Sequence, residues 1–272
     1  MSDASRPVGM FDSGVGGLTV LHECLVSLPQ EDFLYLGDTA IFPYGDKDPA
    51  ELRERIARIA ELLLDRGAKL LVIACNTATS VGEEVAREVA SARGVAVVPV
   101  VEPQAEIAAA ITANARVGVL ATPNTVESGA YRRALEAIGR GLDVIEVEAP
   151  DLASFIQDGA LFDEDTMTMA RSYCAPLMDA GVDTLILGCT HYPLVAPMLQ
   201  RILGRDVRLV SGGHAVAAAV QRALGAAGLD RPSDGEGTYE FISTGDPASF
   251  QAVGTRFLQM PLGKVERVDL PM

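Results

Sequence analysis

The sequence predicts an α/β fold of two pseudo-symmetric domains, each with a mainly parallel sheet flanked by helices. The first observation behind this prediction is that short apolar runs alternate with stretches of helical period along the 272 residues. Residues 48–67, for example, carry a stripe of leucines and isoleucines at helical spacing. Strands that alternate with helices form parallel sheets through right-handed crossovers. The predicted strands are residues 8–11, 33–36, 70–74, 96–101, 116–120, 144–147, 184–187, 208–210 and 239–243.

The second observation is an internal repeat. The segment VGMFDSG near the start resembles VGVLATP in the middle of the chain, and LLVIACNTAT resembles TLILGCTHYP. Gly9 and Cys75, the landmarks of the first half, are 66 positions apart, and Gly118 and Cys189, those of the second, are 71 apart. The order and spacing of the landmarks therefore recur, and each half offers one cysteine at the end of a strand.

The repeat predicts the division into domains. We expect a first domain of residues 1–98 plus 211–272 and a second domain of residues 99–210, with the last strand returning to the first half. Ligands of such folds bind outside the carboxyl ends of the strands. The active site is therefore expected in the cleft between the two domains.

Composition excludes several classes of protein. The net charge of −15 disfavours nucleic acid as a ligand, because phosphate binding draws on clustered lysine and arginine. No apolar run reaches the roughly 18–20 residues of a membrane helix, and the start lacks the pattern of a signal peptide, so a soluble, cytoplasmic protein without a membrane partner is expected. Four cysteines without a C-x-x-C pair and three scattered histidines give no convincing metal site.

Cys75 and Cys189 are the strongest candidates for chemistry. Each follows an apolar strand and precedes an expected helix start, where N–H groups and the helix dipole are expected to lower the pKa of a thiol. A single cysteine at a strand end is as well explained as a small buried apolar residue. Two at matching positions favour a different role: one thiol removes a proton from one face of a carbon and the other delivers a proton to the opposite face. Cys24 and Cys174 lie at helical spacing among apolar residues and are expected in the core.

Glycine-rich and polar turns form a second set of candidates. In FDSGVGG, Asp12 either caps the turn or receives a substrate ammonium group and orients the nearby thiol. The turn PYG at 43–45 has a backbone that is able to wrap a carboxylate, although proline and glycine in a turn need no function. His191, two residues after Cys189, is either a proton relay or a capping residue. Thr122, Asn124 and Thr125 cluster where a strand meets a helix, as caps or as ligands of a carboxylate.

The motifs VGMFDSGVGGLTVL, YLGDTAIFPYGDK, ACNTAT, LATPNTVESGAY and LGCTHYPL, in this order, resemble those of glutamate racemases, in the aspartate/glutamate racemase superfamily. The resemblance covers nearly the whole chain and implies conversion of L-glutamate to D-glutamate for peptidoglycan, without a cofactor, in a cytoplasmic protein that is a candidate homodimer. It implies that Cys75 takes the α-proton from D-glutamate and Cys189 takes it from L-glutamate, assisted by Asp12 and His191. The expected substrate-binding residues are Asp12, Ser13, Pro43, Tyr44, Gly45, Asn76, Thr77, Thr122, Thr125, Thr190 and His191.

Three positions depart from the family pattern. Gln157 stands where the family usually carries a glutamate of the acid–base network beside His191. Ile41 replaces a common arginine, and Ser211 replaces a common aspartate. Two alternatives therefore stay open: a racemase of another amino acid such as aspartate, and a catalytically weakened binding protein that acts on DNA gyrase.

Overall fold

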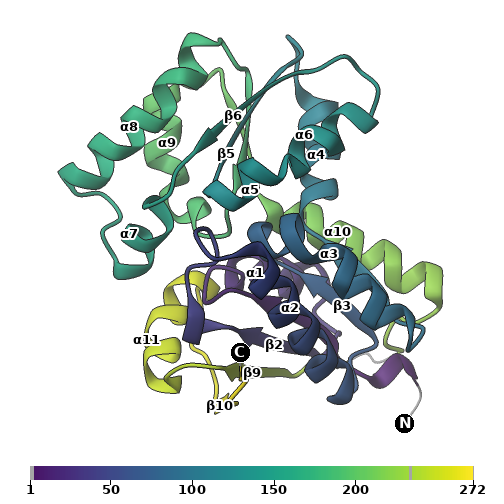
Figure 1. Ribbon diagram of the computed structural model, residues 1–272. Helices are drawn as coiled ribbons and strands as arrows, with labels where there is room; N and C mark the ends of the chain where they lie inside the picture. The colour runs from purple at the N-terminus through teal and green to yellow at the C-terminus, as the bar shows by residue number, and fades with distance from the viewer. Residues whose placement is uncertain (1–2, 233–234, 272) are drawn as a thin grey trace.

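The computed structural model describes residues 3–232 and 235–271 and contains two parallel sheets. Figure 1 shows them in two lobes, the first built from the purple and yellow ends of the chain and the second from its teal and green middle. The first sheet has the order β10-β9-β2-β1-β3-β4 and the second has the order β6-β5-β7-β8. The strands are β1 (Val8–Asp12), β2 (Phe33–Gly37), β3 (Leu70–Ile73), β4 (Ala96–Pro99), β5 (Arg116–Ala121), β6 (Asp143–Glu148), β7 (Thr184–Gly188), β8 (Arg208–Val210), β9 (Tyr239–Ser243) and β10 (Val265–Arg267).

The predicted α/β class with two parallel sheets is confirmed, and all nine predicted strands are present. The sequence analysis missed β10, whose three residues are too few to show a period and are mostly exposed at the edge of the sheet. The central order β2-β1-β3-β4 corresponds to β6-β5-β7-β8, which is the structural form of the internal repeat.

The repeated Val-Gly pair has a packing reason in each half. A Cβ atom on Gly9 would lie 2.8 Å from the Cβ of Ala68, and one on Gly118 would lie 2.8 Å from a methyl of Leu177. Real Cβ atoms do not approach so closely, so each central strand needs a glycine where a neighbouring segment packs against it.

Helices cover the two sheets and form their cores. Around the first sheet lie α1 (Leu18–Ser27), α2 (Pro49–Asp65), α3 (Asn76–Ser91), α10 (Gly212–Ala227) and α11 (Pro247–Leu258), with α1 packed on α10 and α2 on α3. The second part carries α4 (Val101–Ile111), α5 (Pro123–Ser128), α6 (Ala130–Ala137), α7 (Leu152–Asp158), α8 (Glu164–Asp179) and α9 (Ala196–Leu203). Three short 3₁₀ helices complete the order, η1 (Asp3–Ser5), η2 (Thr39–Ile41) and η3 (Tyr192–Val195). In α2 the predicted apolar stripe is fully buried, and Asp48 caps its start.

After the second sheet the chain returns to the first. Helix α10 packs on α1, and β9 and β10 extend the first sheet beside β2. Helix α4 contacts both parts, since it packs on α3 and α10 and also on β7 and α6. The division at residues 98/99 and 210/211 stays a prediction. No helix in the described part of the chain is both long and apolar enough to span a membrane.

Candidate active site

Both candidate thiols line one small cavity between the two sheets. Its open volume is about 20 Å³, enough for about one water molecule and much less than an amino acid needs. The carboxyl ends of β1, β3, β5 and β7 all contribute to its wall, as expected for parallel strands. The lining residues are Ser13, Phe42, Pro43, Tyr44, Gly45, Cys75, Asn76, Thr77, Thr122, Ala153, Cys189, Thr190 and His191. The structure therefore presents the two thiols to a common space in a closed state.

Cys75 is held at the start of a helix. It directly precedes α3, and its Sγ accepts a hydrogen bond from the Ala78 N–H at 3.3 Å. The carboxylate of Asp12 lies close enough for its charge to raise the pKa of this thiol. Cys75 thus sits between N–H donors, which favour a thiolate, and a carboxylate, which opposes one.

Asp12 lies behind this thiol rather than in the cavity wall. It is fully buried, and its carboxylate accepts hydrogen bonds from the Gly14 N–H at 3.0 Å and from the Thr190 hydroxyl at 3.3 Å. Burial raises the pKa of Asp12 above its ordinary value, although these donors oppose the shift. The carboxyl group therefore holds a proton more readily than that of an exposed aspartate.

Cys189 faces a histidine instead of a carboxylate. The Nδ1 atom of His191 lies 3.7 Å from the Cys189 Sγ, and its Nε2 atom lies 3.1 Å from the Oε1 atom of Gln157. An amide oxygen only accepts hydrogen bonds, so Nε2 carries the proton and Nδ1 presents a lone pair to the thiol. The ring packs between Phe42 and Phe257, and burial lowers the pKa of His191 to about 3. The imidazole is therefore neutral, and its Nδ1 lone pair faces the Cys189 thiol.

The prediction that helix starts lower the thiol pKa is wrong for this closed state. Burial is the largest influence and raises the pKa of Cys75 to about 12 from its ordinary value of 9.0, with the charge of Asp12 adding to the rise. Burial also raises the pKa of Cys189, and the N–H of His191 and the hydroxyl of Thr190 offset only part of that rise. Desolvation of a charge in a closed cavity thus outweighs the helix-end donors.

A turn and a helix start close the cavity across the two parts of the chain. The side-chain amide of Asn124 donates to the carbonyl oxygens of Tyr44 at 2.9 Å and Lys47 at 2.8 Å, and its backbone N–H donates to that of Gly45 at 3.0 Å. A Cβ on Gly45 would lie 2.8 Å from the Cβ of Thr122, so this turn needs glycine to approach so closely. The predicted PYG turn therefore lies against the predicted polar cluster.

Hydroxyl groups continue this seam inside the cavity. Thr77 lies 2.9 Å from Thr122 between their Oγ1 atoms, and Thr125 lies 3.0 Å from Thr122 and 3.3 Å from Thr77. The Thr125 side chain lies behind the wall, because it is fully buried and absent from the lining. These hydroxyls bond to one another and so join the two parts of the chain at the cavity.

A buried ion pair holds the turn that contains Tyr44. Arg55 donates to Asp38 through Nε at 2.9 Å and through a second nitrogen at 2.6 Å, and Tyr44 donates its hydroxyl to the same carboxylate at 2.5 Å. Thr244 completes the set at 2.6 Å. The sequence analysis found Tyr44 but missed this support, which joins residues far apart in the chain.

Among the described residues, the wall of the small cavity has neither a cationic side chain nor a set of metal ligands. Its wall has no lysine or arginine, and within the described residues no three histidine, cysteine, aspartate or glutamate side chains cluster as metal ligands do. Polar contacts with a bound anion would come from hydroxyls, amides and N–H groups. Phe42 and Ala153, which the sequence analysis did not single out, add apolar wall.

The remaining sequence predictions concern residues outside the wall. Cys24 and Cys174 are fully buried in the core, as predicted. Ile41 packs at the edge of the core that surrounds α2, and Ser211 precedes α10 without a side-chain cap bond.

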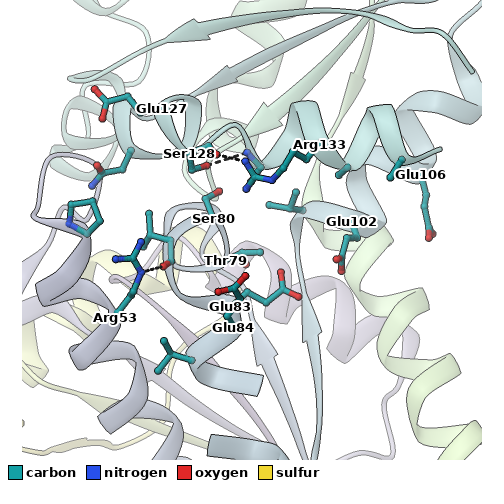
Figure 2. A pocket seen from close by; sticks show the side chains of 18 of the residues that line it. Arg53, Thr79, Ser80, Glu83, Glu84, Glu102, Glu106, Glu127, Ser128 and Arg133 are labelled. Atoms are coloured by element: carbon teal, nitrogen blue, oxygen red, sulfur yellow. Dashed lines mark hydrogen bonds between the residues drawn. The ribbon is translucent and has the colours of Figure 1, made fainter. Parts of the chain in front are cut away.

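A second, larger cavity of about 860 Å³ lies beside α3, α4 and α6 and contains no thiol (Figure 2). Figure 2 shows the carboxylates of Glu83, Glu84, Glu102 and Glu106 around it, with Arg53 on α2 and Arg133 on α6. Its wall carries five glutamates, two arginines and neither cysteine nor histidine, so it has no counterpart to the thiol pair of the small cavity.

The structure has two similar parallel sheets, and a cysteine follows one central strand of each. These features define a class of α/β proteins whose site lies between two similar halves. The Asp/Glu/Hydantoin racemase family model matches residues 26–220, and the chain belongs to this family. The chain is 42% identical over 265 residues to the glutamate racemase of Geobacter metallireducens, and the alignment covers 97% of each chain.

Solved structures agree with this assignment. The glutamate racemase of Francisella tularensis, crystallised with D-glutamate, superposes with a TM-score of 0.91 at 31% identity and covers 97% of this chain and 98% of its own. The glutamate racemase of Thermus thermophilus, crystallised with beta-chloro-D-alanine, gives a TM-score of 0.86 at 39% identity and covers 99% of both chains. The fold is therefore shared over 97–99% of this chain with two glutamate racemases, one solved with D-glutamate and the other with beta-chloro-D-alanine.

Proposed function

We propose that the protein is a cofactor-independent glutamate racemase that uses Cys75 and Cys189 as its two bases. The single observation that carries the proposal is the shared cavity, because two thiols from equivalent strands line it together. The full-length likeness to proteins named glutamate racemase supports glutamate as the substrate. Supply of D-glutamate for peptidoglycan and a cytoplasmic location belong to the same proposal.

Substrate binding requires the cavity to open. About 20 Å³ does not hold an amino acid, so the hydrogen bonds between Asn124 and the 43–47 turn, and those among the threonines, must break or lengthen first. Ser13, Asn76 and Thr190 then offer polar groups to the carboxylates of glutamate. The ammonium group adds a positive charge near two buried thiols, which favours their thiolate forms and offsets part of the burial effect on the pKa of Cys75.

The reaction balances as two coupled proton transfers. The Cys189 thiolate takes the α-proton of L-glutamate and becomes a thiol, while the electron pair of the broken C–H bond stays on the α-carbon. The Cys75 thiol gives its proton to the opposite face of that carbon and becomes a thiolate, and D-glutamate results. In the reverse direction the two cysteines exchange roles. The cysteine that acts as the base first loses its own proton, Cys189 to His191 and Cys75 to Asp12.

Stabilisation of the carbanion comes from fixed neutral donors. N–H and hydroxyl groups in a small, closed cavity act on developing charge more strongly than they would in bulk water. A closed cavity also keeps water away from the carbanion. Burial of nearly every polar residue in the wall is consistent with both effects.

The test is racemisation in D₂O, starting from each enantiomer of glutamate and of aspartate. We expect inversion of glutamate with deuterium at the α-position, slower turnover of aspartate, and loss of inversion in both Cys75→Ser and Cys189→Ser. Faster inversion of aspartate would overturn the substrate, and inversion that survives in either variant would overturn the two-base mechanism.

A further inference from the structure

We propose that Gln104 is a positioning residue that fixes the two cysteine-bearing strand ends relative to each other. The proposal rests on the two-base function and deepens it, because inversion needs both thiols correctly placed at the same carbon. Gln104 lies in the first turn of α4, the helix that contacts both parts of the molecule, and it is completely buried.

The amide oxygen of Gln104 holds the Cys75 side. It accepts a hydrogen bond from the Asn76 side-chain nitrogen at 2.9 Å and another from the Tyr131 hydroxyl at 2.5 Å. Asn76 also donates to the Tyr131 oxygen at 2.6 Å, which closes a triangle of three side chains. Asn76 directly follows Cys75 and lines the cavity, so the triangle fixes the backbone next to the first thiol.

The amide nitrogen of the same side chain holds the Cys189 side. It donates to the carbonyl oxygen of Leu187 at 3.2 Å and to that of Val210 at 3.4 Å. Leu187 belongs to β7 and stands two positions before Cys189, and Val210 ends the neighbouring strand β8. One side chain therefore bonds to the residue after the first thiol and to the strand that leads to the second.

Burial makes this arrangement rigid. A buried amide that loses a partner leaves a polar group without water to replace it, so movement of either strand end away from Gln104 is opposed. A hydrocarbon side chain of similar length would fill the space but bond to neither strand. The hydrogen bonds from residue 104 to Asn76, Tyr131 and β7 would then be lost. Only the hydrogen bond between Asn76 and Tyr131 would remain.

Misplacement of one thiol has a distinctive chemical consequence. A correctly placed base still removes the α-proton, and exchange of its proton with D₂O returns deuterium to the same face. Inversion additionally needs the second thiol at the opposite face, and displacement of about 1 Å costs up to about 10²-fold in rate. The ratio of inversion to exchange with retention therefore reports the relative placement of the two thiols, whereas loss of folded protein lowers both rates equally.

The experiment measures both rates from L-glutamate and from D-glutamate in D₂O, at low conversion, for the unmutated full chain and four variants. Gln104→Met removes every hydrogen bond of the side chain. Gln104→Glu keeps two acceptor oxygens for Asn76 and Tyr131 and loses the donor to Leu187 and Val210. Tyr131→Phe removes only the hydroxyl from the triangle. Gln200→Met is the matched control, since Gln200 also donates to two carbonyls, but these belong to Gly204 and Val207 in the loop after its own helix and not to a strand that carries a thiol.

We expect the ratio of inversion to exchange to fall about tenfold or more in Gln104→Met, less in Gln104→Glu and least in Tyr131→Phe, with no change in Gln200→Met. An unchanged ratio in both Gln104 variants would overturn the role of Gln104, whatever happens to the absolute rates. If Gln104→Met does not fold, Gln104→Glu and Tyr131→Phe decide by the same ratio. Absence of inversion in the unmutated protein would instead overturn the proposed function, so the two failures are distinguishable.

Discussion

Cys75 and Cys189 follow equivalent strands of two like sheets, yet the groups around them are chemically opposite. Cys75 caps a regular helix directly and has the acid Asp12 behind it. Cys189 stands three residues before the short 3₁₀ helix η3 and has the neutral base His191 beside it. The scaffold is repeated, but the titratable group beside each thiol is not.

This difference suggests how a symmetric scaffold handles an asymmetric problem. Two carboxylates beside two thiols would place several negative charges in one dry cavity, where each raises the pKa of the others. One carboxylate and one neutral imidazole limit that charge to a single group. The residues that hold the cavity wall also differ in charge. A buried ion pair between Arg55 and Asp38 holds Tyr44, whereas the neutral amide of Gln157 holds His191.

The largest expected effect separates the two thiols. Cys75→Ala should abolish exchange from D-glutamate while exchange with retention from L-glutamate continues, and Cys189→Ala should give the reverse. Each lost exchange should fall by about 10²–10⁴-fold, the usual contribution of a positioned base. Deuterium incorporation into the recovered starting enantiomer, followed by mass spectrometry, measures it.

The double variant Cys75→Ala/Cys189→Ala is the control and should exchange neither enantiomer. Loss of both exchanges in each single variant would contradict separate bases and would indicate that the thiols act only as a coupled pair.

The next effect concerns the supports. Arg55→Met leaves the carboxylate of Asp38 buried without its ion-pair partner, and such a loss costs about 3–5 kcal/mol of unfolding free energy. The turn at Tyr44 should loosen, so KM for glutamate should rise more than kcat falls. Urea unfolding and steady-state kinetics measure the two changes.

Arg66→Met is the matched control, because its pair with Glu266 is largely exposed and is expected to contribute at most about 1 kcal/mol. Equal losses in the two arginine variants would show that burial of the Asp38 pair is not what matters.

The outcome of the sequence analysis follows the same division between local and long-range features. The strands were predictable because strands of a parallel sheet are buried on both faces and therefore read as continuous apolar runs. The thiol pair was predictable because the repeat places both cysteines after equivalent strands. β10 was missed because a strand of three mostly exposed residues carries no pattern.

Properties that depend on how the two halves close could not be read from the sequence. The direction of the thiol pKa shifts was predicted wrongly, because the helix-end donors are local while burial comes from the whole closed cavity. Gln104 and Tyr131 are 27 positions apart and lie in ordinary helices, so nothing local indicates their contact. Phe42 has no reactive group, and only its position against His191 shows its effect on the imidazole.

A third effect, of a few kcal/mol, is a contrast in acid stability between Asp12 and His191. Burial lowers the pKa of His191 to about 3 from 6.5, so the unfolded chain binds the extra proton between these values. Stability should therefore fall as pH drops from about 6.5 toward 3, and His191→Asn should remove that fall. Burial raises the pKa of Asp12 above 3.8, so the folded protein binds the extra proton there, and stability falls as pH rises through the shifted value.

Asp12→Asn should accordingly stabilise the protein at pH 7, and this gain should vanish near pH 3.8, while racemisation falls. Urea unfolding at pH 4, 5, 6 and 7 measures both slopes. Slopes of the same sign at the two positions would contradict the assignment of opposite chemistry to the two sides.

The smallest effect sharpens the comparison at Gln157. In Gln157→Glu a carboxylate replaces the amide oxygen 3.1 Å from the His191 Nε2 atom, and an opposite charge at that distance favours the imidazolium form. The site is partly exposed, so the pKa of His191 should rise by only about one unit. Arg256 already donates to the backbone oxygen of residue 157, which favours tolerance of the new charge. A more basic imidazole accepts the Cys189 proton more readily, so exchange of L-glutamate should rise by up to about tenfold while exchange of D-glutamate stays constant. NMR titration of the ring and single-enantiomer exchange measure the two changes, and equal changes for both enantiomers would show that His191 does not serve Cys189 alone.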